Sequence, residues 1–139
     1  MEGKSASGSC LCGKITLYTD DMKADLGVCH CSKCRKWSGG PFFAVDCGKN
    51  VKIEGEKNLG VYESSEWGER AFCKNCGTSL FFRLKDNSFY SINSEIFNNA
   101  DLHFAHQIFV DEKPKYYEFS NQTHNMTGEQ VFAAFATKE

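Results

Sequence analysis

Short stretches in which apolar and polar residues alternate recur along the chain, and they predict a protein built mainly of β-strands. The clearest lies at residues 14–19, where apolar Ile15 and Leu17 alternate with polar neighbours. The same reasoning predicts strands at residues 42–45, 51–54, 59–63, 79–84, 88–93 and 107–110, and a short strand at 116–119. The polar residues 85–87 join two of these strands in a predicted hairpin.

Helical signals are few and short. Residues from Ser32 to Trp37 predict a single helical turn. Thr127 followed by Gln130 forms a capping box, which predicts a helix near the C-terminal end. Residues 1–8 are small and polar and predict a loose tail, and residues 120–128 predict a polar, flexible stretch. The pattern as a whole indicates a mainly β fold with short helices.

Length and charge narrow the function classes. A chain of 139 residues fits one domain, residues 1–139, and its 16 basic and 18 acidic residues leave a net charge of −2. This balance gives no overall field to attract nucleic acid or an anionic membrane. We find neither a secretory signal nor an apolar run long enough to span a bilayer, so we expect a cytoplasmic protein without a membrane or nucleic-acid partner. The oligomeric state stays open.

The eight cysteines carry most of the chemical information. In a reducing compartment such a number indicates metal ligands rather than disulfides. Close neighbours in sequence also rarely reach disulfide geometry without strain. Seven of the cysteines fall into three clusters, namely Cys10 and Cys12, then Cys29, Cys31 and Cys34, then Cys73 and Cys76.

Zinc prefers four tetrahedral ligands, and thiolates satisfy it well. The two pairs together supply four thiols and would close one structural site. The triplet supplies three, which is typical of a catalytic site with one open position. Cys47 is the remaining cysteine. It either completes the triplet and closes both sites, or it is a packed or surface thiol.

The residues around the triplet are candidates for substrate binding. Lys33, Arg35 and Lys36 form a small basic cluster that would receive substrate carboxylates, and Arg35 would make a bidentate pair. The alternative is a solvated charged surface. His30 lies between two ligands and would orient the site, move a proton or hydrogen-bond to nearby backbone.

The clusters and their neighbours resemble the glutathione-dependent formaldehyde-activating enzyme family, which also contains the centromere protein V-like domains. The matching segments are Gly8-Ser9-Cys10-Leu11-Cys12-Gly13, Cys29-His30-Cys31-Ser32-Lys33-Cys34-Arg35, Phe72-Cys73-Lys74-Asn75-Cys76-Gly77-Thr78, and His106-Gln107-Ile108-Phe109-Val110 with Lys113. They cover a core from residue 8 to residue 119. Cys47 and the polar stretch with its short helix at residues 120–139 lie outside the matching pattern.

The resemblance implies a β-rich fold built around zinc knuckles, often described as a β-tent. It also implies two zinc ions per chain. The structural zinc would be held by Cys10, Cys12, Cys73 and Cys76. The catalytic-type zinc would be held by Cys29, Cys31 and Cys34.

The activity that the resemblance implies is that of a zinc-dependent carbon–sulfur lyase. The family's reaction adds glutathione to formaldehyde and gives S-hydroxymethylglutathione, so a small thiol such as glutathione is the expected partner. The substrate thiol would bind the open zinc position as a thiolate, or zinc would polarise the aldehyde oxygen. The alternative function is a non-catalytic zinc-binding module that binds a protein. The charge balance disfavours nucleic-acid binding, and a methionine sulfoxide reductase would need a redox cysteine when only Cys47 is spare.

Overall fold

The computed structural model describes residues 3–98 and 100–136, so both ends of the predicted domain, residues 1–2 and 137–139, lie outside the described residues. The chain divides into two compact units. The first comprises Met1–Ala24 and Ala44–Leu102, and the second comprises Asp25–Phe43 and His103–Glu139. Strands dominate the described residues, so the structure is mainly β, as the alternating pattern predicts.

The first unit is built from antiparallel strands. Its three-stranded sheet has the order β1-β2-β5. A second set of antiparallel strands follows the order β4-β9-β8-β7-β6. The bounds are β1 (Lys4–Ser9), β2 (Thr16–Met22), β4 (Phe42–Asp46), β5 (Val51–Glu54), β6 (Leu59–Glu63), β7 (Gly68–Cys73), β8 (Ser79–Leu84) and β9 (Tyr90–Asn93), with short 3₁₀ turns η1 (Glu56–Asn58) and η2 (Ser94–Ile96).

Apolar side chains from these strands fill the core of the first unit. In β2, Leu17 and Thr19 are buried while Tyr18 between them is exposed, which confirms the predicted half-buried strand. The hairpin of β8 and β9 is also confirmed, with pairing from Phe81 to Ile92. The largest side chains that are fully buried here include Ile15, Leu17, Val45, Leu80, Phe81 and Ile92.

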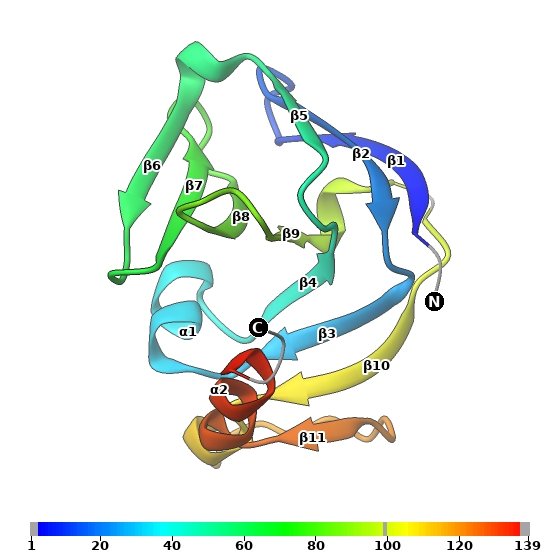
Figure 1. The fold of residues 1–139 in the computed structure, drawn as a ribbon, viewed down its shortest axis with the longest axis vertical. Coiled ribbons are helices and arrows are strands. Elements are labelled where there is room, and N and C mark those ends of the chain that lie inside the picture. The colour runs from blue at the N-terminus through cyan, green and yellow to red at the C-terminus, as the bar shows by residue number, and fades with distance from the viewer. Residues whose placement is uncertain (1–2, 99, 137–139) are drawn as a thin grey trace. The chain divides into compact units, whose positions relative to one another are not determined.

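The second unit combines parallel strands with both α-helices. Its strands follow the order β11-β10-β3, and neighbouring strands are parallel (Figure 1). Phe43, Phe104 and Phe119 pack together, with ring centroids 5.1 to 5.7 Å apart. Neither described helix is long and apolar enough to cross a lipid bilayer. The bounds are β3 (Asp25–Cys29), α1 (Ser32–Ser38), β10 (His103–Ile108), η3 (Val110–Glu112), β11 (His124–Met126) and α2 (Gly128–Ala136).

The predicted capping box starts helix α2. The backbone N–H of Thr127 donates to Gln130 Oε1 at 2.8 Å, and the backbone N–H of Gln130 donates to Thr127 Oγ1 at 3.3 Å. These two bonds satisfy backbone donors that have no partner inside the helix. The prediction of a helix after Thr127 is therefore confirmed, and so is the helical turn at α1.

Four strands, β1, β3, β7 and β11, form where the pattern predicts none. Strand β1 occupies residues of the predicted loose tail, because its backbone hydrogen-bonds to β2 although its side chains are small and polar. Strand β7 was not predicted, because Arg70 occupies a buried position, with 7% exposure, where an apolar residue would mark a strand. For β1 and β7, pairing with neighbouring strands determines the structure, and the local sequence carries no strand signal.

Three predictions in the second unit need correction. No strand forms at residues 116–119, where Tyr117 and Phe119 make aromatic contacts. The strand predicted at 107–110 ends at Ile108 and begins earlier, at His103. The polar stretch 120–128 contains β11, which pairs with β10.

Candidate metal centres and the adjoining cavity

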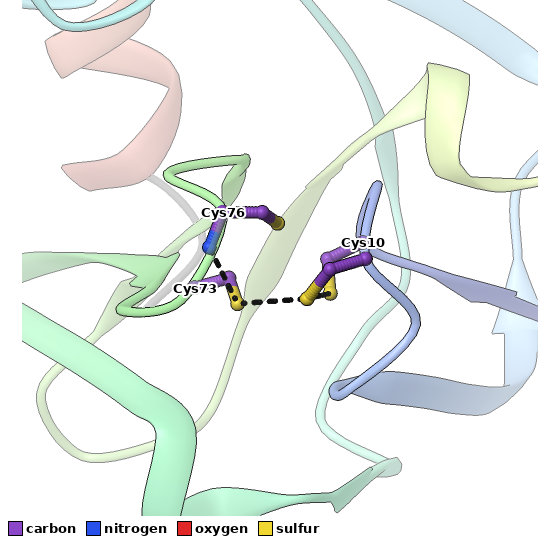
Figure 2. A group of neighbouring side chains, drawn as sticks. Cys10, Cys73 and Cys76 are labelled. Carbon is purple, nitrogen blue, oxygen red and sulfur yellow. Dashed lines mark hydrogen bonds between the residues drawn. The ribbon is translucent and has the colours of Figure 1, made fainter.

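Two tight turns bring four thiols together in the first unit. The Sγ atoms of Cys10, Cys12, Cys73 and Cys76 all lie within 4.8 Å of one another. Figure 2 shows Cys10 from one segment facing Cys73 and Cys76 from the other. The Sγ of Cys12 lies 3.6 Å from that of Cys10 and 3.8 Å from that of Cys73. A zinc–sulfur bond of about 2.3 Å puts the sulfurs of a tetrahedral centre about 3.8 Å apart, so the spacing fits one zinc ion.

The two turns share the same backbone design. Gly13 and Gly77 follow their cysteine pairs with φ of 81° and 79°, which side-chain-bearing residues rarely adopt. The backbone N–H of Gly13 donates to Cys10 O at 3.1 Å, and that of Gly77 donates to Cys73 O at 2.8 Å. Each glycine therefore lets the chain double back directly behind its thiols.

Thr78 stabilises the second turn and links it to the first. Its Oγ1 accepts the backbone N–H of Leu11 at 3.1 Å and lies 3.1 Å from the Sγ of Cys76. Hydrogen bonding by the Thr78 side chain lowers the pKa of Cys76 to about 5. Cys76 is therefore a thiolate at neutral pH, the form in which cysteine binds a metal.

The triplet lies within the second unit, at the junction of β3 and α1. The Sγ atoms of Cys29, Cys31 and Cys34 lie within 4.8 Å of one another. Cys31 is the N-cap of α1, and its Sγ accepts the backbone N–H of Cys34 at 3.4 Å. Hydrogen bonds with Cys31, then with Cys34, and then burial raise the pKa of Cys29. A cation between the three thiols would remove this penalty on the thiolate.

The described part of the chain supplies three thiols to this group. Cys47, the candidate fourth ligand, is fully buried in the first unit, and its Sγ donates to Val45 O at 3.7 Å. Burial, followed by the charge of Asp46, raises the pKa of Cys47 to about 12. Cys47 is therefore a packed, protonated thiol, which is the second of the two roles considered from the sequence. All eight cysteines lie in the described residues, and none of them forms a disulfide.

His30 lies between Cys29 and Cys31 in sequence, and its imidazole ring is fully buried. Nδ1 lies 2.7 Å from the Tyr117 hydroxyl, and Nε2 lies 2.8 Å from Gln107 Oε1. Burial lowers the pKa of His30, so the ring is neutral at pH 7. Both ring nitrogens are hydrogen-bonded within the chain, so this histidine has no lone pair left for a metal. Its predicted contact with substrate remains a prediction.

A cavity of about 260 Å³ is lined by residues that neighbour the triplet in sequence, although none of the three cysteines is among its lining residues. Arg35 and Lys36 line it, and they follow Cys34 directly on α1. Lys33 lies on the same helix but is not among the lining residues. Two of the residues predicted to bind substrate therefore share this cavity with Tyr116, which the sequence analysis did not single out. The full lining is Ser32, Arg35, Lys36, Gly39, Gly40 and Tyr116.

A larger cavity of about 840 Å³ lies in the first unit. Its lining comes from residues 5–7, 18–20 and 49–52, and no cysteine is among them. The smaller cavity is the better candidate for a substrate, because it borders residues adjacent to Cys31 and Cys34.

A mainly β fold with one four-thiol group and one three-thiol group defines a cysteine-cluster protein with two candidate metal centres. The glutathione-dependent formaldehyde-activating enzyme family matches residues 5–112. The chain belongs to this family, as its motifs predict.

Individual relatives agree with this assignment. An uncharacterized lyase of Schizosaccharomyces pombe is 38% identical over 126 residues, which cover 89% of this chain and 92% of the relative. A putative glutathione-dependent formaldehyde-activating enzyme of Podospora anserina is 36% identical over 102 residues, covering 67% of this chain and 45% of the relative. The crystal structure of a Rhodobacter sphaeroides protein superimposes with a TM-score of 0.58 at 23% identity, covering 67% of this chain and 88% of that one. This last similarity shows the fold alone.

Proposed function

We propose that the protein is a zinc-dependent carbon–sulfur lyase that forms or cleaves a glutathione-type thiol adduct. The reaction we assign is formation of S-hydroxymethylglutathione from glutathione and formaldehyde, or of a related adduct. The observation that carries the proposal is the three-thiol group of Cys29, Cys31 and Cys34, together with a cavity whose basic lining, Arg35 and Lys36, follows Cys34 directly on α1. Family membership and the lyase name of the 38% identical relative support it.

The two cysteine groups would have different roles. The four thiols of the first unit fit a closed structural zinc site, since they fill a tetrahedral ligand set. The three thiols of the second unit fit a site of the catalytic type. Zinc at the second site would lower the pKa of a substrate thiol that occupies the fourth position.

The net chemistry is an addition of the thiol across the carbonyl group of formaldehyde. A sulfur–carbon bond forms, the carbon–oxygen double bond becomes a single bond, and the thiol proton ends on the oxygen. Glutathione carries two carboxylates, and Arg35 and Lys36 line the cavity where one of them would be held. The protein contributes binding, orientation and a stabilised thiolate, and it is unchanged at the end of the cycle.

The test measures adduct formation from glutathione and formaldehyde by exchange NMR, relative to the spontaneous rate, with zinc content determined on the same samples. Cys31→Ser removes one thiol of the triplet while serine remains a good helix N-cap. We expect it to reduce the enzymatic rate by at least about 100-fold, since disturbing even the surroundings of metal ligands costs about 10- to 100-fold. The matched control is Cys47→Ala, a cysteine outside both groups, which retains the activity.

Glutathione ethyl ester, in which the glycine carboxylate is blocked, extends the same test. If Arg35 and Lys36 hold that carboxylate, the ester binds more weakly than glutathione. A zinc-loaded wild-type protein that neither binds glutathione nor accelerates the reaction would refute the proposal and favour the non-catalytic zinc module.

A further inference from the structure

His30 bonds to one wall of the smaller cavity directly and to the residue next to its other wall. Through its backbone, His30 O accepts the Arg35 Nε–H at 2.9 Å, which fixes the basic wall. Through its ring, Nδ1 meets the Tyr117 hydroxyl at 2.7 Å, in the segment that also carries Tyr116. Tyr116 and Arg35 line the same cavity. One buried residue is therefore bonded to Arg35 of one wall and to the neighbour of Tyr116 in the other.

The hydrogen bonds around the imidazole ring of His30 determine which of its two nitrogens donates. Gln107 Nε2 donates to Thr123 Oγ1 at 2.9 Å, so Gln107 Oε1 is the acceptor facing the histidine. His30 Nε2 therefore carries the proton and donates, which leaves Nδ1 as an acceptor. The Tyr117 hydroxyl must then be the donor to Nδ1. This bond requires a hydroxyl at residue 117, and phenylalanine cannot replace it.

Consecutive tyrosines in this segment have opposite environments. Tyr117 packs on the His30 ring at 5.5 Å between centroids, and the Lys113 Nζ donates to its backbone oxygen at 2.9 Å. Tyr116 is 81% exposed and packs against Tyr117, with ring centroids 5.5 Å apart. Both tyrosines follow residue 112, where the family match ends, so family membership does not account for this wall.

We propose that Tyr116 is a specificity-determining residue for the thiol substrate, and that His30 is a positioning residue that holds Tyr116 in place through Tyr117. The inference rests on the proposed function. At about 260 Å³ the cavity is smaller than a site for a whole drug-sized ligand, so it takes one end of the substrate. Arg35 and Lys36 suit a carboxylate, and the tyrosine ring covers the peptide group next to it. The substrate class is thus a thiol peptide with a terminal carboxylate.

The test compares glutathione affinity by calorimetry in zinc-loaded protein. Tyr116→Ala is expected to weaken binding about fivefold to tenfold, since the ring loses the apolar area that the ligand would cover. Tyr117→Phe is expected to weaken binding about threefold with unchanged zinc content, because the anchor to His30 is lost. In the Tyr116→Ala background, Tyr117→Phe has no further effect if it acts only through Tyr116.

Two further variants keep the test decisive. Lys113→Met releases the backbone oxygen of Tyr117 without touching His30, and it replaces Tyr117→Phe if that variant does not fold. Tyr62→Ala removes another exposed tyrosine, which is 67% exposed on β6 in the first unit, and leaves the affinity unchanged.

The outcomes separate this inference from the proposed function. If the wild type binds glutathione and Tyr116→Ala binds it equally well, this inference is wrong while the proposed function stands. Additive losses in the double variant overturn the positioning role of His30 and Tyr117. An absence of glutathione binding in the wild type overturns the proposed function itself.

Discussion

Metal loss from the four-thiol group is expected to destabilise the protein far more than metal loss from the triplet. The four thiols join segments 61 residues apart in sequence, so a metal there closes a long loop. For a cross-link of that span, the chain-entropy relation gives a stabilisation of about 4 kcal/mol. The triplet lies within the short segment from Cys29 to Cys34, for which the same relation gives about 2 kcal/mol.

Matched double variants test this difference. Cys12→Ser with Cys76→Ser removes one thiol from each segment, and neither side chain is buried. Cys29→Ser with Cys31→Ser removes two half-buried thiols of the triplet. At about 3 °C per kcal/mol for a domain of this size, we expect the first pair to lower the Tm by more than about 10 °C and the second by about half as much.

The assay is thermal unfolding by circular dichroism with zinc content measured on each sample. Total stability of a domain is about 5–15 kcal/mol, so a loss of about 4 kcal/mol leaves a marginal fold. Chelation of the wild type removes metal from both groups and should therefore lower the Tm further than the first pair does. Equal Tm losses for the two pairs, or no loss for the first, would refute the reasoning from loop closure.

Two other predictions concern residues outside both cysteine groups. Thr127→Ala removes the Oγ1 acceptor of the capping box and should cost about 1 kcal/mol, measured by urea unfolding, while Thr127→Ser should cost little; an equal loss for both would contradict the cap. Burial raises the pKa of Cys47 from 9.0 to about 12, so above pH 9 the unfolded chain loses a proton that the folded chain keeps. The contribution of Cys47 is complete below pH 9 and disappears as pH rises toward 12, at about 1.4 kcal/mol per pH unit. Cys47→Ala should flatten this alkaline decline, and an unchanged slope would show that another group causes it.

The order of the cysteine clusters was sufficient to predict both candidate metal groups. Thiols two or three residues apart point into one turn for local reasons, and Gly13 and Gly77 supply the backbone conformation that such turns need. Because zinc takes four ligands, the two cysteine pairs, Cys10 with Cys12 and Cys73 with Cys76, together make one complete site. The capping box of α2 is equally local, since Thr127 and Gln130 complete it within one turn.

Other parts of the fold had no local signal. Strand β1 depends on hydrogen bonds to β2, and β10 pairs in parallel with β3, which precedes it by many residues. The β1–β2 pair is antiparallel, and β1 itself is small and polar, so its own residues give no strand signal. Parallel pairing joins segments that are distant in sequence, so the partner of β10 cannot be predicted from its own residues.

The same distinction applies to the cavity and its surroundings. Arg35 and Lys36 follow Cys34 directly in the sequence, so their closeness to the triplet could be predicted. The placement of Tyr116 and the burial of His30 between Gln107 and Tyr117 depend on contacts across most of the second unit's sequence span. Local sequence determines which turns can bind metal, because a turn is set by a few neighbouring dihedral angles. Tertiary structure decides which side chains surround that metal site, because the packing of distant segments sets them.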